Sequence, residues 1–315
     1  MTNWITKING SDVQNTTDAH FILNQQAAES AEGVGFSVIN YAPYQLRDAA
    51  DEDVEIRVTT LLSGVQPDDL VIVQWPMWQA DARFEKIFIE KIRLIPRVKI
   101  AALLWEVMPW LMTDDLSDGM HPEMTKLRDF DLLLVANRKL AEQLRDSGGI
   151  TSPILAMGLT DFKCQGSLNA KADFKKLVVI DSSYDEEQLS YHGQLPFTAM
   201  ADGGFGVVPA ARSQYEAHTN SLELSKYLSM GLPVVIRSNM AQAELVRVHN
   251  LGIVLDDLNA IDAVLADMTM MDYQEKLPAV GSWSEAVRSG YFVKRACLES
   301  IRILKLGEVD CLAEI

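Results

Sequence analysis

Short apolar runs alternate with longer amphipathic stretches along most of this 315-residue chain. The clearest run is 70–73, Leu-Val-Ile-Val, which is apolar on both faces, as strands buried within parallel sheets are. In the stretch 84–95 that follows, apolar residues recur at helical spacing with charged residues between them. This rhythm predicts an α/β fold built from parallel βαβ units.

The rhythm continues for long enough to predict two Rossmann-like domains. A polar stretch at 161–174 with little periodicity predicts an interdomain linker. We therefore expect an N-terminal domain over 1–157, a C-terminal domain over 158–290, and a C-terminal helix over about 291–315. The expected strands are 4–8, 36–41, 70–74, 98–104, 132–135, 153–157, 177–180, 206–208, 233–236 and 252–255.

Composition excludes several classes of function. With 44 acidic and 28 basic residues, the formal net charge of −16 argues against a nucleic-acid binder and against attachment to anionic lipid by bulk charge. No apolar run approaches the ~20 residues of a membrane span, and the N-terminus lacks the pattern of a signal peptide. The cysteines are far apart, so we expect no disulfide framework, no zinc site and a cytoplasmic protein.

Ligands of open α/β sheets bind beyond the carboxyl ends of the strands, which restricts the site to a few loops. In the first loop, Asn15 and Thr16 precede a helix and suit an anion or sugar hydroxyls, although ordinary helix capping explains them equally. Gln74, Trp75 and Trp78 follow the strongest strand. Their indoles either stack on a sugar or base, or pack beneath the loop.

Glu106 follows the next strand and lies between two tryptophans of the sequence. This position suits a general base, with an ordinary solvated carboxylate as the alternative. In the second domain, the polar segment 215–221 leads into a helix whose N-terminus can face a diphosphate. No GxGxxG motif or Walker loop is present, so dinucleotide or ATP binding of the usual kind loses support.

Sequence blocks in the same order along nearly the whole chain resemble one family of bacterial glycosyltransferases. The blocks are 6–16, 71–78, 203–206, 228–236, 244–252 and 290–295. The family is the accessory glucosyltransferases that modify serine-rich-repeat adhesins, whose relatives are often labelled beta-1,6-galactofuranosyltransferases.

The resemblance implies a GT-B fold: two Rossmann-like domains facing a central cleft, with the C-terminal helix crossing back to the N-terminal domain. It also implies a UDP-sugar donor, no metal or other cofactor, and a homo-oligomer that adds glucose to GlcNAc already on serine or threonine. Asn15, Thr16, Gln74, Trp75 and Trp78 would contact the acceptor, and Glu106 stands where the family has an acid after a histidine. The residues expected at the nucleotide-sugar are Gly204, Arg212, Tyr215, Thr219, Asn220, Ser221, Glu223 and Lys226.

Two departures from the family pattern fall on the donor side. Glu223 stands where the family has a lysine suited to a diphosphate, so it would repel UDP unless Lys226 or Arg212 reaches in. By comparison with the family pattern, the C-terminal domain also lacks roughly twenty residues near 158–175, a count consistent with normal element lengths.

Three functions remain open at this point. The first is a UDP-sugar-dependent hexosyltransferase with Glu106 as the base that accepts the proton of the acceptor hydroxyl. The second is a catalytically silent GT-B relative that binds an acceptor or a partner glycosyltransferase. The third is a sugar-nucleotide epimerase of GT-B fold, for which no matching set of His, Glu and Asp residues can be located. UDP release and UDP binding discriminate between the first two.

Overall fold

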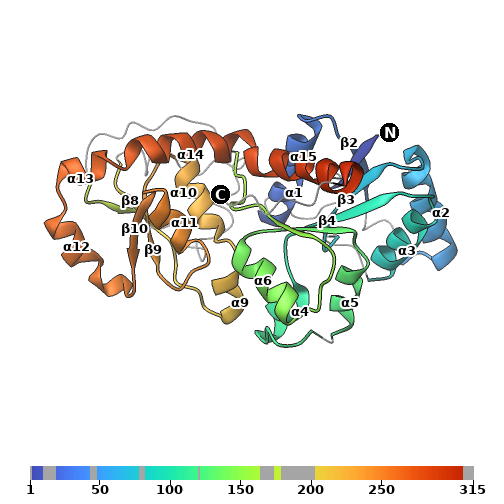
Figure 1. Cartoon of the computed structure of the whole chain (residues 1–315), viewed down its shortest axis with the longest axis horizontal. Coiled ribbons are helices and arrows are strands. Elements are labelled where there is room, and N and C mark those ends of the chain that lie inside the picture. The colour runs from blue at the N-terminus through green and yellow to red at the C-terminus, as the bar shows by residue number, and fades with distance from the viewer. Residues whose placement is uncertain are drawn as a thin grey trace.

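The computed structural model describes residues 2–9, 19–42, 48–77, 82–119, 121–163, 174–178 and 203–307. It contains two parallel sheets, which lie side by side in Figure 1 with helices packed around each. We call the six-stranded sheet with its helices the N-terminal half and the four-stranded sheet with its helices the C-terminal half. Within the described residues no helix is long and apolar enough to cross a membrane.

The sheet of the N-terminal half has the strand order β2-β1-β3-β4-β5-β6, and all its strand pairs are parallel. The order reverses between β1 and β3, which is the switch point where doubly wound sheets bind ligands. All six strands predicted from the sequence are present. They are β1 Asn3–Ile8, β2 Ser37–Tyr41, β3 Leu70–Trp75, β4 Lys99–Leu104, β5 Leu132–Val135 and β6 Ile154–Ala156.

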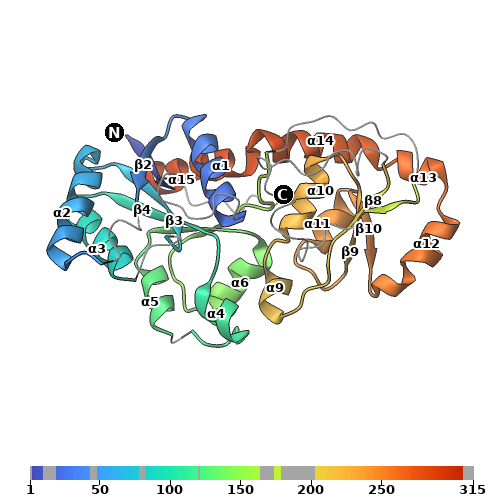
Figure 2. The same cartoon turned by 180° about the vertical axis from the view of Figure 1, so that it is seen from behind.

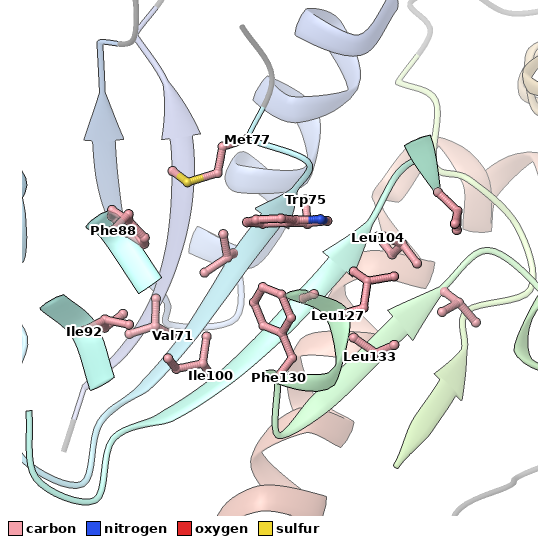
Figure 3. Close-up of a cluster of buried hydrophobic side chains, with 14 of the residues drawn as sticks. Val71, Trp75, Met77, Phe88, Ile92, Ile100, Leu104, Leu127, Phe130 and Leu133 are labelled. Carbon is pink, nitrogen blue, oxygen red and sulfur yellow. The ribbon is translucent and has the colours of Figure 1, made fainter. Parts of the chain in front are cut away.

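Both faces of this sheet are covered because its strands alternate apolar side chains between two cores. In β3, Val71 and Val73 belong to one core, whereas Leu70 and Ile72 belong to the other. Figure 3 shows the first core, where Trp75 lies above Phe130. Its helices are α2 Asp51–Leu61, α3 Ala82–Arg93, α4 Met108–Thr113, α5 Pro122–Arg128 and α6 Arg138–Asp146, and α1 Ala19–Glu32 covers the other face.

The sheet of the C-terminal half has the order β10-β9-β8-β7, again with parallel pairs. The strand predicted at 177–180 is described as far as Val178, and its remainder lies outside the described residues. The strands are β7 Leu177–Val178, β8 Phe205–Val207, β9 Val234–Arg237 and β10 Gly252–Leu255. The helices are α9 Gln214–His218, α10 Leu222–Ser229, α11 Ala243–Val248, α12 Ile261–Asp267, α13 Met270–Gln274 and α14 Leu277–Ser289.

The C-terminal helix α15, Tyr291–Leu306, returns to the N-terminal half, as the GT-B expectation requires. It follows α14 after Gly290, whose φ of +74° favours glycine. Both views show α14 over the C-terminal half and α15 beside α1 (Figures 1 and 2). Ala296 and Cys297 of α15 are buried in the second core of the N-terminal half. Two parallel α/β halves joined by a returning helix constitute a GT-B architecture.

The expectation of a linker over 161–174 is wrong at its beginning. Phe162 is buried in the core of the C-terminal half, and Asp161 is 4% exposed. The Asp161 carboxylate accepts hydrogen bonds from the backbone N–H groups of Phe292 (3.2 Å) and Val293 (2.7 Å), which lie in the first turn of α15. Residues 164–173 lie outside the described residues. The chain between the halves is therefore anchored to the returning helix.

Burial raises the pKa of Asp161 to about 7, although the two N–H groups and the nearby Lys163 and Lys294 favour its ionised form. The free energy cost of removing the ionised carboxylate from water is larger than the stabilisation that these hydrogen bonds and charges provide. The group therefore binds a proton more tightly in the folded protein than in the unfolded chain.

Replacing Asp161 with asparagine should flatten the dependence of stability on pH. In wild type, this group lowers the free energy of unfolding as the pH rises from ~4 to ~7, by up to about 4 kcal/mol, because the folded state holds the proton that the unfolded state has lost. The asparagine variant lacks this slope and differs otherwise by a constant offset. Urea unfolding at several pH values measures both, with the exposed Asp267→Asn as control. A wild-type-minus-variant difference that does not change with pH would contradict the assignment.

A polar network joins the carboxyl edge of the first sheet to the chain that follows α9. Asn137 caps α6 by accepting from the N–H of Leu140 (2.9 Å). Its amide nitrogen donates to the backbone oxygen of His218 (2.9 Å) and to Asn220 Oδ1 (3.0 Å). Asn220 in turn donates to the backbone oxygen of Gly158 (3.2 Å). One side chain therefore caps a helix in one half and holds a loop of the other.

Substitutions at Asn137 should separate these two roles. Asn137→Ser keeps an acceptor for the helix cap and removes the donor to the C-terminal half, so the free energy of unfolding should fall by about 1–3 kcal/mol. Asn137→Ala also removes the cap and should cost about 1 kcal/mol more. Denaturant titration measures both. If Asn137→Ser matches wild type, the link between the halves contributes nothing to stability.

Candidate active site between the two halves

Glu106 lies just beyond the carboxyl end of β4, at the junction of the halves. Its side chain is 22% exposed, so it is largely but not fully withdrawn from water. One carboxylate oxygen, Oε2, accepts a hydrogen bond from the hydroxyl of Tyr215 (2.7 Å). The other, Oε1, lies 3.5 Å from Nε2 of His20. The carboxylate is thus held between a residue of α1 and a residue of α9.

His20 was not identified from the sequence. It is the second residue of α1, and its side chain is 34% exposed. Imidazole and carboxylate at this distance can share a proton or orient one another, which is the arrangement that general acid–base chemistry uses. The sequence signal was a histidine at the start of the helix after the first strand. Its partner is 86 positions further along the chain, so only the tertiary fold brings the two together.

Tyr215 was expected at the nucleotide-sugar, and the structure places it elsewhere. Its ring is 2% exposed and packs in the core of the N-terminal half, although α9 precedes the helices of the C-terminal half. Its hydroxyl accepts a hydrogen bond from the N–H of Val107 (2.7 Å) while donating to Glu106. Burial and the charge of Glu106 raise the pKa of Tyr215 well above its ordinary value, so the hydroxyl keeps its proton.

Asp114 fixes the start of α9 against the end of α4. Its carboxylate accepts from the backbone N–H groups of Tyr215 (2.8 Å) and Gln214 (3.1 Å), and these bonds lower the pKa of Asp114. Both views show α4 and α9 next to each other at the junction (Figures 1 and 2). Since α9 is only five residues long, this cap and the buried tyrosine together determine where it lies.

An open hollow of about 400 Å³ lies beside this contact. Its lining combines carboxylates, amides, a hydroxyl and an imidazole, groups that can bind sugar hydroxyls or water. The lining residues are Asp114, Asp115, Leu116, Ser117, Gln143, Gln214 and His218. None of the residues predicted for the site is among them, so the hollow is separate from the predicted contacts.

Gln74 and Trp75, predicted to contact the acceptor, are buried instead. The Gln74 amide donates to the backbone oxygens of Thr6 (2.7 Å) and Asn24 (3.0 Å), and its oxygen accepts from the Trp105 indole (3.0 Å). Trp75 is 4% exposed and meets Phe130 edge to face, with ring centroids 5.3 Å apart (Figure 3). Gln74 therefore links β3 to β1 at the switch point, whereas Trp75 packs in the core on one face of the sheet, so neither side chain is exposed for an acceptor contact. Asn15, Thr16 and Trp78 lie outside the described residues.

On the donor side, the structure brings together Ser221, Glu223 and Lys226 at α10. The Ser221 hydroxyl donates to Glu223 Oε2 (2.8 Å), and its backbone N–H donates to Gln242 Oε1 (2.8 Å). The Lys226 ammonium lies 6.0 Å from the centroid of the Phe162 ring, and burial lowers the pKa of Lys226. No carboxylate of the described residues lies within ion-pair distance of it. A half-buried cation therefore lies near the chain that connects the halves.

The structure does not bring the remaining predicted donor residues to this point. Arg212 is largely exposed, and its guanidinium pairs with Glu216 of α9 (2.6 Å). Thr219 donates to the backbone oxygen of Glu216 (3.3 Å), and Asn220 is bound to the N-terminal half as described. These three side chains organise the segment around α9.

Gly204 precedes β8 and so lies at the amino edge of its sheet, opposite the edge where ligands bind. Its N–H donates to the Tyr273 hydroxyl (3.2 Å). A Cβ at Gly204 would come within 2.2 Å of the backbone oxygen of Lys176, and its φ is +100°. The close approach that glycine permits is therefore to the backbone of Lys176, and the predicted nucleotide contact stays a prediction.

Comparison with known proteins covers nearly the whole chain. The family model described as glucosyltransferase 3-like, N-terminal domain, matches residues 2–159, and the corresponding C-terminal domain model matches residues 156–300. Glucosyltransferase 3 of Streptococcus parasanguinis is 23% identical over 328 residues, covering 95% of this chain and 97% of the relative. Glucosyltransferase 3 of Streptococcus gordonii is 23% identical over 332 residues, covering 94% and 97%.

Among solved structures, spinosyn forosaminyltransferase SpnP covers 95% of both chains with a TM-score of 0.33 and 13% identity. The two family models together match nearly all of the described sheets and helices, from β1 into α15. This chain therefore belongs to the glucosyltransferase 3-like family.

Proposed function

We propose that this protein transfers a hexose, with glucose the favoured sugar, from a UDP-sugar to GlcNAc on a serine- and threonine-rich protein. Family membership and the two relatives named glucosyltransferase 3 support a glycosyltransferase. The observation that carries the proposal is the Glu106 carboxylate at the junction of the halves, held between His20 and Tyr215. The UDP donor, the acceptor and a homo-oligomer are proposed from the family resemblance, and a cytoplasmic location is proposed from the sequence patterns described above.

In the proposed reaction, Glu106 accepts the proton of the acceptor hydroxyl, directly or through His20. The hydroxyl oxygen then bonds to the anomeric carbon, while the bond from that carbon to the β-phosphate oxygen breaks and UDP leaves. The negative charge that develops on UDP needs a fixed cation or N–H donors close by. A cationic side chain can stabilise this negative charge, so we propose that the reaction needs no metal.

Two donors support a phosphate site beside α10: Lys226 in the last turn of α10 and Gln242 at the start of α11. The Lys226 ammonium has no ion-pair partner among the described residues, and burial makes its positive charge costly. The Gln242 side chain is 2% exposed, and its amide nitrogen finds no hydrogen-bond partner in the described structure. A phosphate would give either group the partner it lacks, which is the expected use of polar atoms that are buried but unpaired.

Replacing Glu106 with glutamine should lower kcat by about 100-fold or more, because the amide cannot accept the proton. The amide oxygen can still accept from the Tyr215 hydroxyl, so the fold is retained. UDP release from UDP-glucose with a GlcNAc-bearing peptide measures the rate, with chelator present to test the metal-free reaction. Glu142→Gln, on the exposed face of α6, is the matched control. Unchanged turnover in Glu106→Gln would eliminate Glu106 as the base.

Removing the charge of Lys226 should weaken UDP binding by more than tenfold, since a charge pair at ~4 Å contributes about 4 kcal/mol at an effective dielectric constant of about 20. Lys226→Met therefore loses affinity, whereas Glu223→Gln gains it because a repulsive charge disappears. Calorimetric titration with UDP measures both, with Lys276→Met, whose ammonium makes an exposed hydrogen bond to Asn250, as control. Equal affinities for wild type and Lys226→Met would place the diphosphate elsewhere.

Glu223 favours a second candidate function, a catalytically silent relative that binds an acceptor or a partner glycosyltransferase. The acid lies in the first turn of α10 and is hydrogen-bonded to Ser221, so a negative charge occupies the place where a phosphate would approach. Absence of any thermal shift with UDP, together with capture of a partner glycosyltransferase in nucleotide-free buffer, would favour this function over transfer.

A further inference from the structure

We propose that Tyr215 is a positioning residue that holds the Glu106 carboxylate in its reactive orientation and couples it to the donor side of the protein. This inference rests on the proposed function, because it concerns the base of that reaction. It assigns to Tyr215 a role different from the nucleotide contact that the sequence predicted.

The hydroxyl of Tyr215 can point its proton in one direction only. One of its lone pairs accepts from the N–H of Val107 (2.7 Å), which directs the O–H bond to Glu106 Oε2 (2.7 Å). The ring is fixed by burial in the core of the N-terminal half. Glu106 and Val107 are neighbours in the chain, so a single hydroxyl fixes both the backbone and the carboxylate of this turn.

The hydrogen bond to Oε2 also determines which group the other carboxylate oxygen, Oε1, faces. With Oε2 occupied, Oε1 is the oxygen left to face His20, 3.5 Å away. Loss of the hydroxyl would free the carboxylate to rotate about its last torsion, which is broad and low in barrier. Tyr215 therefore holds Glu106 in the orientation in which Oε1 faces His20 Nε2.

The coupling follows from the place of Tyr215 in the chain. It lies in α9, and four residues after α9 ends the chain enters α10, with Ser221 as its N-cap. Asn220, between the two helices, is bound to the N-terminal half through Asn137. Fewer than ten residues separate the start of α10 from Tyr215. A ligand that orders the start of α10 thus also restrains the segment that carries Tyr215. Binding at the donor side is transmitted to the base through this segment.

The test compares Tyr215→Phe with Tyr41→Phe. Tyr41 is also fully buried in the same core, but its hydroxyl has no hydrogen-bond partner in the described structure, so its loss should leave activity unchanged. Tyr215→Phe should lower kcat about tenfold with little change in KM, since a hydrogen bond to a charged group is lost while substrate contacts remain.

A double variant shows whether Tyr215 acts through Glu106. In the Glu106→Gln background, adding Tyr215→Phe should cause no further tenfold loss, because the group being positioned is no longer a base. A full additional tenfold loss would overturn the inference. Equal kcat for wild type and Tyr215→Phe would also overturn it.

Hydrogen exchange provides a readout that does not depend on turnover. The Val107 amide should exchange faster in Tyr215→Phe than in wild type or Tyr41→Phe, because its acceptor is gone. UDP should slow this exchange in wild type and leave it unchanged in Tyr215→Phe. If wild type turns over no donor but Val107 responds in this way, the proposed function has failed and the coupling stands. If Val107 exchange is the same in all three proteins, the inference is overturned.

Discussion

The arrangement of the two halves depends on one buried side chain that crosses between them. Tyr215 follows β8 of the second sheet in sequence, yet its ring belongs to the core of the first. Burying an aromatic ring contributes a few kcal/mol, and the paired hydroxyl avoids the penalty of an unsatisfied polar group. Asp114 at the start of α9 and Asn137 at its end add hydrogen bonds from the N-terminal half. The two halves therefore meet through a shared hydrophobic core, and not only through an interface between two separately folded domains.

Sequence reasoning succeeded where a pattern is local. The strands of the first sheet are buried on both faces, so they read as continuous apolar runs, and β3 at Leu70–Trp75 differs from the expected 70–74 by one residue. That one residue mattered. Trp75 was interpreted as the start of a binding loop, whereas it is the last residue of the strand and points into the core. Periodicity does not determine where a strand ends, because no following strand residue shows whether the last one still belongs to the alternating pattern.

The site was less predictable because its members meet through tertiary contacts. Glu106 was found because a carboxylate after a buried strand stands at the ligand-binding edge of a parallel sheet. His20 and Asp114 carry no local signal of that kind. A glycine indicates a close approach but not which group approaches, and at Gly204 that group is the backbone of Lys176. The linker prediction is wrong at Asp161 because this polar side chain is buried, where its carboxylate accepts hydrogen bonds from the first turn of α15.

The returning helix α15 also constrains how the chain can acquire its structure during synthesis. One face of the first sheet is closed by Val293, Ala296 and Cys297, which are translated almost 140 residues after β6 ends. Until the ribosome has released that helix, the N-terminal half exposes an apolar strip on a sheet whose strands are otherwise complete. An isolated N-terminal fragment would carry the same strip permanently, so we expect it to aggregate unless α15 is supplied with it.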